Sequence, residues 1–159
     1  MNGLTDYQLE EATKGYSKVA GERFNACKLA TNSHIEAWML WAIWCACDRE
    51  GESFGLSLER EMPADLGGTS VLVIPQLDIG NYKADFAIAY NQGSRIIVEC
   101  DGHDFHEKTK QQAQHDKQRD RFVQDKGWKI YRFTGSEIYK SPLTCANGVI
   151  ESLRRASYE

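Results

Sequence analysis

The chain has 159 residues, 42% of them hydrophobic and 26% charged, which fits one globular domain with a sizeable core. The net charge of -4 argues against generic binding to polyanions, but it does not exclude an enzyme that acts on one, because clustered acids neutralised by a metal also lower the net charge. Five cysteines without a C-x-x-C pair indicate reduced thiols and a cytoplasmic protein. No apolar block resembles a signal peptide, and the most apolar window, 37–47, is shorter than the roughly 20 residues that span a membrane.

Two helices are predicted in the first third of the chain. Capping-box patterns begin at Thr5 and Ser33 and open helices over 4–25 and about 35–49, with a connection over 25–31. The second helix is apolar on nearly all sides, which is typical of a helix buried in a core. Its three tryptophans within seven positions lead us to expect that this helix is the hydrophobic centre of the domain. They are Trp38, Trp41 and Trp44.

The rest of the chain alternates between strands and helices. A short strand is predicted over 53–58, and a second begins at Val71 and should be limited by Pro75. An alternating run over 82–90 places Ala84 and Phe86 on one face and Asp85 on the other. The remaining elements are a turn at 91–94 and a strand over 95–101 that pairs antiparallel with the run before it. A polar segment over 106–126, helical at least from 113 onward, is followed by a strand over 128–133, a short helical turn over 134–140 and a helix over 142–155.

Two acids end the strand over 95–101. Glu99 and Asp101 occupy alternate positions and therefore point to one face, opposite to Cys100. Two carboxylates about 4 Å apart repel by about 4 kcal/mol at an effective dielectric near 20. A chain that places them together normally supplies a cation, and antiparallel pairing would bring Asp85 to the same face. The pattern indicates a metal-dependent enzyme.

These acids, followed by a helix that carries Arg and Lys, suggest phosphodiester hydrolysis. Mg²⁺ prefers oxygen ligands and keeps several waters, and Mn²⁺ should substitute for it. Such a metal activates water and neutralises charge on the scissile phosphate.

Four segments carry a resemblance to a known superfamily. They are Tyr82-Lys83-Ala84-Asp85-Phe86, Val98-Glu99-Cys100-Asp101-Gly102, Asp116-Lys117-x-Arg119-Asp120 and the strand that follows Gly127. In this order they resemble the PD-(D/E)xK restriction-endonuclease-like nucleases, most closely the branch related to very-short-patch-repair endonucleases and its bacterial relatives. The resemblance covers about 33–138.

The resemblance implies an α/β fold with a restriction-endonuclease-like core. A central mixed sheet of about four strands would be flanked by helices in α-β-β-β-α-β order, with an extra N-terminal helix. The whole chain, 1–159, is then one nuclease-like domain. Its parts would be an N-terminal helical extension over 1–31, a core over 32–140 and a C-terminal helix over 141–159.

The implied activity is that of a Mg²⁺-dependent endonuclease acting on DNA, with RNA as the alternative substrate. The resemblance assigns Asp85 as the central metal ligand and Glu99 as the second, with Glu36 and Asp101 near the metal. Asp101 stands where the superfamily's usual motif has the lysine that orients or activates the attacking water. The candidates for the missing basic function are Lys83, Lys117, His103 and His106, and those for contacts with nucleic acid are Lys83 and Arg119.

Several alternatives stay open. Glu36 also fits the N3 position of the Ser33 capping box, and Arg119 could pair with Asp116 one helical turn away. The same fold could serve as a catalytically inactive module that binds nucleic acid or protein. Cys100, His103 and His106 are ligand types that zinc accepts, although strand alternation turns Cys100 away from Asp101. Without a recognisable DNA-reading motif, specificity should come from loops, the N-terminal helix, a homodimer or a partner protein.

Overall fold

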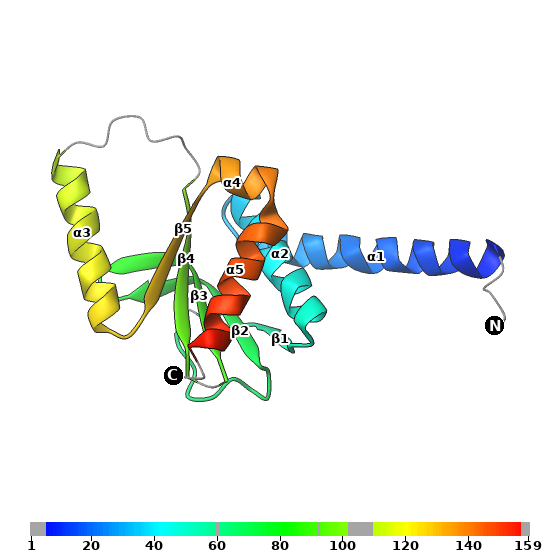
Figure 1. The fold of residues 1–159 in the computed structure, drawn as a ribbon, viewed down its shortest axis with the longest axis horizontal. Coiled ribbons are helices and arrows are strands. Elements are labelled where there is room, and N and C mark those ends of the chain that lie inside the picture. The colour runs from blue at the N-terminus through cyan, green and yellow to red at the C-terminus, as the bar shows by residue number, and fades with distance from the viewer. Residues whose placement is uncertain (1–5, 60, 92, 102–109, 157–159) are drawn as a thin grey trace.

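The computed structural model describes residues 6–59, 61–91, 93–101 and 110–156. Its elements, shown in Figure 1, are α1 (Asp6–Ala30), α2 (His34–Glu50), β1 (Phe54–Leu56), β2 (Val71–Ile79), β3 (Tyr82–Tyr90), β4 (Arg95–Asp101), α3 (Lys110–Asp125), β5 (Lys129–Thr134), α4 (Gly135–Lys140) and α5 (Pro142–Arg155). The strands form one sheet in the order β1-β2-β3-β4-β5. The two outer pairs are parallel and the two inner pairs antiparallel, which confirms the expected mixed α/β architecture.

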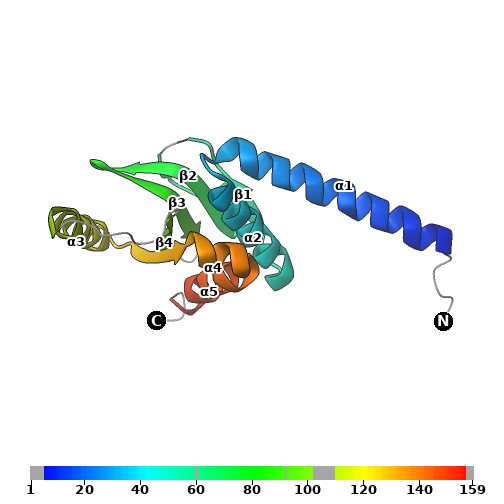
Figure 2. The same ribbon diagram turned by 90° about the horizontal axis from the view of Figure 1, so that it is seen from above.

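Helices cover both faces of this sheet. On one face, α2, α4 and α5 pack over a core that includes Leu40, Phe86 and Ile150. On the other face, α3 and Trp128, which precedes β5, cover a smaller core that includes Ile97 and Val123 (Figure 2). Each inner strand therefore contributes alternate residues to two separate apolar layers, and α2 and α3 lie on opposite sides of the sheet.

Helix α2 lies in the larger core, but its tryptophans do not fill it. Met39, Leu40 and Ile43 are fully buried, whereas Trp38 is 40% exposed and packs its ring 5.4 Å from that of Phe24 in α1. The prediction that this helix is buried in the core is therefore confirmed, although its tryptophans are not its most buried residues. Aliphatic side chains occupy the interior, and the larger rings border it, where α1 reaches the domain.

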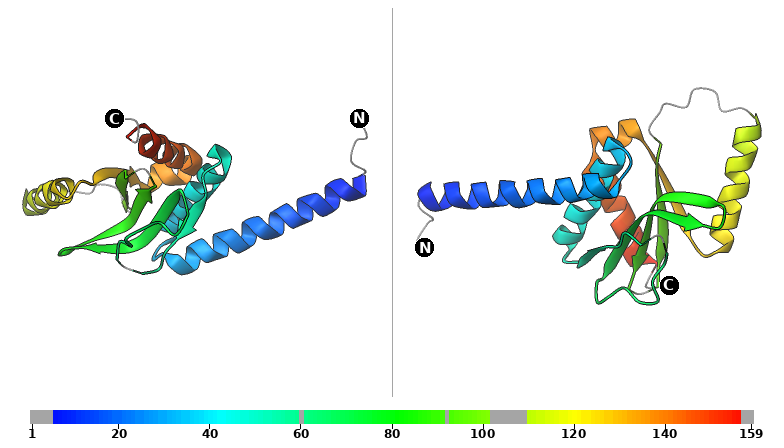
Figure 3. Two further views of the ribbon diagram at one scale, coloured as in Figure 1. Left: turned by 90° about the horizontal axis from the view of Figure 1, so that it is seen from below. Right: turned by 180° about the vertical axis from the view of Figure 1, so that it is seen from behind.

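Helix α1 continues through the connection that was expected over 25–31. Cys27 is fully buried, Phe24 packs against α2, and Arg23 pairs with Asp48 of α2 while lying over the Trp44 ring. These contacts stabilise the last two turns as helix, because tertiary packing outweighs weak local propensity. The rest of α1 extends away from the domain, as Figures 1 and 3 show.

Strand β2 passes through Pro75, where a strand end was expected. Main-chain groups of alternate residues point to the same neighbour, and the Val73 carbonyl accepts a 3.0 Å hydrogen bond from Ser57 on the β1 side. Pro75 faces that same side, but β1 ends at Leu56. The missing N–H of proline therefore costs no ladder hydrogen bond, as is usual where a strand edge is open.

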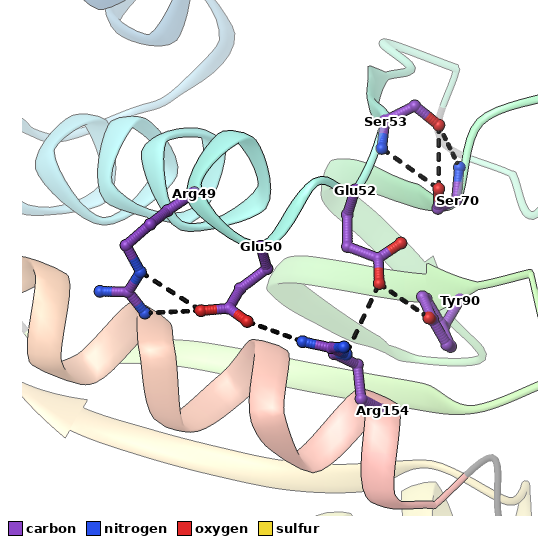
Figure 4. Close-up of polar contacts among 7 residues, drawn as sticks. All are labelled: Arg49, Glu50, Glu52, Ser53, Ser70, Tyr90 and Arg154. Atoms are coloured by element: carbon purple, nitrogen blue, oxygen red, sulfur yellow. Dashed lines mark hydrogen bonds and ion pairs between the residues drawn. The ribbon is translucent and has the colours of Figure 1, made fainter.

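A polar network fastens α5 to the C-terminal end of α2 (Figure 4). Arg154 Nη1 donates a 2.7 Å hydrogen bond to Glu50, and its Nε lies 3.6 Å from Glu52. The Tyr90 hydroxyl donates a 2.9 Å hydrogen bond to the same oxygen of Glu52. This network joins α2, α5 and β3 at the end of the domain away from Glu36, and so helps to fix the helix that carries Glu36.

No helix in the described ranges combines the length and the apolar composition needed to cross a membrane.

Candidate active site

The inner strands lose their regular alternation at one level of the sheet. Ala84 and Ala87 both face the smaller core, while Phe86 between them faces the larger one. In β2, Ile74 and Leu77 likewise face the smaller core, three positions apart. The expectation that Ala84 shares a face with Phe86 is therefore wrong.

The residues at this irregularity are Gln76 and Asp85. They stand opposite each other, between the paired positions Pro75–Phe86 and Leu77–Ala84. Gln76 has a φ of 56°, a left-handed conformation that is unusual for a residue other than glycine and that often marks a functional site. Both strands shift by one residue at the same place, so the pairing resumes beyond it with the same register.

Strands β3 and β4 separate at the same level. Their ladder runs from Ala89–Arg95 to Phe86–Val98, and Asp85 and Glu99 come directly after the last pair. The Asp85 carboxylate turns into this opening and accepts a 2.7 Å hydrogen bond at Oδ2 from the Cys100 N–H. A side-chain oxygen thus satisfies an N–H that the β3 ladder leaves unpaired.

Glu36 approaches the irregular level of the sheet from α2 and contacts Gln76 of β2. Its carboxylate is buried, and Oε2 accepts 3.1 Å hydrogen bonds from the Asn32 N–H and from Gln76 Nε2. Its main-chain N–H donates a 3.2 Å hydrogen bond to Ser33 Oγ, so the N-cap prediction is also confirmed. The main chain of Glu36 therefore serves the helix cap, while its side chain turns towards β2 and accepts from Asn32 instead of closing the capping box on Ser33. Its place near a metal stays a prediction.

Glu99 forms an ion pair with Arg119 of α3. The side chain of Glu99 is 9% exposed and that of Arg119 is 22% exposed, so this pair is largely shielded from water. Burial raises the pKa of Glu99 to about 6, although Arg119 acts in the opposite direction. The carboxylate therefore ionises less readily than usual even with a cation beside it.

Helix α3 is held in position by contacts on both sides of Arg119. Arg132 of β5 stands next to Glu99 in the parallel pairing and donates a 2.8 Å hydrogen bond to Asp120. This ion pair lowers the pKa of Asp120. Phe122 packs over the turn between β2 and β3, where a Cβ on Gly80 would come within 2.9 Å of its ring. These contacts direct Arg119 towards the sheet.

Asp101 completes the group of acids. It pairs with Thr134 at the end of β5, and its Oδ2 is buried with no hydrogen-bond partner in the described part of the chain. Burial is the main reason why the pKa of Asp85 is raised, and the charges of Glu36 and Asp101 raise it further. Buried carboxylates that disfavour one another's ionisation are chemically suited to a divalent cation with oxygen ligands.

The acids do not form a closed metal cage by themselves. Within the described ranges, no group of three or more His, Cys, Asp or Glu side chains is arranged to hold a metal ion. Glu36 is engaged by Gln76, Asp85 by the Cys100 N–H, and Glu99 by Arg119. The donor chemistry fits Mg²⁺, but the carboxylates are individually bonded to other groups.

The remaining predicted residues lie in different places. Lys83 is 3.8 Å from Asp78 across the hairpin, and it also lines a small cleft under α3 together with Glu99 and Arg119. Lys117 is exposed on α3. His103 and His106 lie outside the described residues, so their roles stay predictions. The Cys100 side chain packs against the larger core, and burial raises its thiol pKa, which makes it a poor zinc ligand.

Two residues of the site were missed by sequence reasoning. Gln76 holds Glu36, and its only signal is a polar residue within the apolar run 71–79. Arg132 holds Asp120, and nothing in the alternation of its strand distinguishes it from a solvent-facing residue. Arg119 was expected to pair with Asp116 or a phosphate, and its partner Glu99 follows only from the position of α3.

A cavity of about 430 Å³ lies at the other end of α2. It is bordered by α2 and α5, and none of the predicted site residues lines it: the lining consists of Arg49, Glu50, Asn147, Ile150, Glu151, Arg154 and Arg155. This cavity is therefore separate from the predicted site. The acids lie instead where β3 and β4 separate.

A mixed sheet between helices, with acids at the point where two inner strands separate, defines a restriction-endonuclease-like protein. The family model REase_MTES_1575 matches residues 59–153, more than half of the chain, and the chain therefore belongs to this restriction-endonuclease-like family. No curated protein and no solved structure matches the chain significantly. The matched segment contains Gln76, Asp85, Glu99 and Arg119, whereas Glu36 lies before it.

Proposed function

We propose that this protein is a metal-dependent endonuclease that hydrolyses phosphodiester bonds in DNA. The observation that carries the proposal is the convergence of Asp85 and Glu99 at the separating ends of β3 and β4. Both carboxylates are shielded from water, and the pKa of each is raised. A fold that needed these residues only for stability would gain nothing from holding two poorly solvated acids beside one another. Membership of the family supports the same activity.

Mg²⁺ is the proposed cofactor, with Mn²⁺ as a substitute. Asp85, Glu99 and Asp101 would hold it, and Glu36 would contribute from α2. When bound, the ion would lower the pKa of a water molecule and neutralise charge on the phosphate. The buried Oδ2 of Asp101 has no hydrogen-bond partner among the described residues, and this supports the assignment, since a buried carboxylate oxygen without a donor is costly unless a cation is supplied.

The chain's own residues would position the substrate. Lys83 and Arg119 border the same small cleft as Glu99, so a phosphate that approached its rim would meet two cations. Arg119 offers a planar fork of donors that suits phosphate oxygens. The proton acceptor for the attacking water is proposed among His103, His106 and Lys117, because Asp101 occupies the position of the usual lysine. The resemblance to very-short-patch-repair endonucleases favours DNA as the substrate.

A second candidate function is a catalytically inactive module that binds nucleic acid. Two observations favour it: Asp101 replaces the usual lysine, and Arg119 already neutralises Glu99. In that case Arg119 would be a permanent substitute for the metal, and the site would be purely structural.

Incubation with nucleic-acid substrates distinguishes the two. Purified protein is mixed with supercoiled plasmid, linear duplex or single-stranded RNA, each with Mg²⁺, Mn²⁺ or excess EDTA. The endonuclease should nick or linearise plasmid with either metal and should be inactive in EDTA. Binding to DNA without cleavage under every metal condition would favour the inactive module.

A further inference from the structure

The Glu99 carboxylate would have to bind two different cations, Arg119 and the proposed metal ion. The structure pairs its Oε1 with the Arg119 guanidinium, while the proposed function requires the same side chain to hold a divalent cation. The pair is mostly buried, so each partner depends on the other for compensation of its charge. A guanidinium and a divalent cation at one carboxylate repel each other, and the repulsion is strong where water is excluded. Occupation of Glu99 by the metal therefore opposes its pairing with Arg119.

The contacts that hold α3 against the sheet do not depend on the Arg119–Glu99 pair. The neighbouring residue, Asp120, is bound to Arg132 of β5, and Phe122 packs over the turn between β2 and β3. These contacts do not involve Arg119 and would keep α3 against the sheet. The Arg119 side chain is 22% exposed and lines the cleft with Lys83, so a rotamer change would bring its charged end towards solvent.

We propose that Arg119 is a counter-ion switch: it neutralises Glu99 in the metal-free protein and is displaced when the metal binds, which frees its guanidinium for a substrate phosphate. This inference rests on the proposed function. Its consequence is that metal and DNA binding are coupled. Each would favour the state in which Arg119 has left Glu99, and by thermodynamic reciprocity each would raise the affinity for the other.

The test is metal affinity, measured without any cleavage. Mn²⁺ binding to wild type, Arg119→Gln and Arg121→Gln is measured by calorimetry at pH 8, where Glu99 is ionised. Arg121 lies on the same helix and is exposed, so its variant controls for the loss of one positive charge. We expect Arg119→Gln to bind Mn²⁺ about tenfold more tightly, within the usual range of coupling between sites, and Arg121→Gln to match wild type.

A second measurement tests whether the Arg119 guanidinium, once displaced from Glu99, contributes to DNA binding. Affinity for a short DNA duplex is measured with and without Ca²⁺ for the same proteins. Ca²⁺ should raise the affinity of wild type more than that of Arg119→Gln. An equal gain in both proteins would contradict the role of Arg119 at the phosphate.

The outcomes distinguish failure of the Arg119 switch from failure of the proposed function. If wild type binds no Mn²⁺ and neither variant does, the proposed function fails. If wild type binds Mn²⁺ and Arg119→Gln binds it equally or more weakly, the metal site stands and the switch is wrong. Thermal unfolding guards against misfolding of the variant, because a folded Arg119→Gln protein should gain more stability from Mn²⁺ than wild type does. Arg119→Lys, which keeps the charge, should lie between the two.

Discussion

The Asp85 carboxylate accepts a 2.7 Å hydrogen bond from the Cys100 main-chain N–H at the level where β3 and β4 stop pairing. Beyond the last main-chain pair, the Asp85 side chain thus provides the hydrogen bond that connects β3 to β4. The separation of the two strands therefore leaves the Cys100 N–H hydrogen-bonded, to a side chain instead of a main-chain carbonyl. At this opening the charges of Glu36, from the helix on one face, and of Asp101, from β4, both raise the pKa of Asp85.

Replacing Asp85 by Asn should separate stability from activity. Burial and neighbouring acids raise the pKa of Asp85, so its ionised form is disfavoured in the folded protein. Asn keeps an oxygen that can accept from Cys100 and removes the charge. We expect the free energy of unfolding, measured in urea at pH 7.5 with EDTA, to rise. Lower stability than wild type would mean that the charge of Asp85 supports the fold.

Glu99 should make the metal-free protein less stable as the pH rises. Its folded pKa of about 6 lies above the ordinary 4.5, so the folded protein keeps this proton to higher pH than the unfolded chain does. Raising the pH from about 4.5 to about 6 therefore removes about 2 kcal/mol of stability. Urea unfolding of wild type and Glu99→Gln across pH 4–8 isolates this contribution. The difference between the two proteins should follow that pH window, and a difference independent of pH would refute the assignment.

Metal affinity should show the opposite dependence on pH. A carboxylate must be deprotonated to bind a metal, so Mn²⁺ binding should weaken as the pH falls through about 6, by up to tenfold per pH unit. Calorimetric titration between pH 5 and 8 measures it. An affinity unchanged over that range would remove Glu99 from the ligand set.

The two roles of Glu36 can be measured separately. Ser33→Ala removes the oxygen that caps α2 and should cost about 1 kcal/mol of stability while leaving Mn²⁺ affinity unchanged. Glu36→Gln keeps the main-chain N–H that serves the cap and removes the buried charge. It should reduce Mn²⁺ affinity with little loss of stability. If both variants change stability alone, Glu36 is only a helix-capping residue.

Gln76 should matter through its side chain more than its backbone. Gln76→Ala leaves Glu36 without one donor, and we expect a loss of about 1–3 kcal/mol in stability together with slower cleavage. Gln76→Gly makes the same deletion but suits the φ of 56° better, so it should be the more stable of the two. Gln76→Gly less stable than Gln76→Ala would show that the left-handed conformation is not strained.

The sequence predicted the order of the elements better than their limits. Alternation and turn residues located β3, the turn after it and β4, because those signals are local. The passage of β2 through Pro75 depends on β1 ending at Leu56, which is a fact about a neighbouring strand. The continuation of α1 past residue 25 depends on packing against α2. Neither cause is visible in the local pattern.

For the site, the sequence pattern pointed to candidate acids, whose roles stay predictions, but not to the residues that hold them. Asp85, Glu99 and Asp101 are recognisable because charged residues interrupt apolar strands. The Gln76–Glu36 bond joins residues 40 positions apart, and it depends on a left-handed conformation that no residue type signals. The Arg119–Glu99 pair likewise depends on where α3 lies against the sheet. The spacing of residues within one helix or strand shows which of them share a face, but not which residues of other elements that face contacts.

The most direct test is plasmid cleavage by two matched variants in Mg²⁺. Asp85→Asn removes the acid at the opening of the sheet, and Asp78→Asn removes an exposed acid from the same hairpin, where it faces Lys83. Metal assistance is worth several kcal/mol, so Asp85→Asn should nick supercoiled plasmid at least about 100-fold more slowly than wild type. Asp78→Asn should match wild type, and EDTA should stop both. Equal nicking by Asp85→Asn and wild type, or no nicking by wild type with either Mg²⁺ or Mn²⁺, would contradict the assignment of a metal-dependent nuclease centred on Asp85.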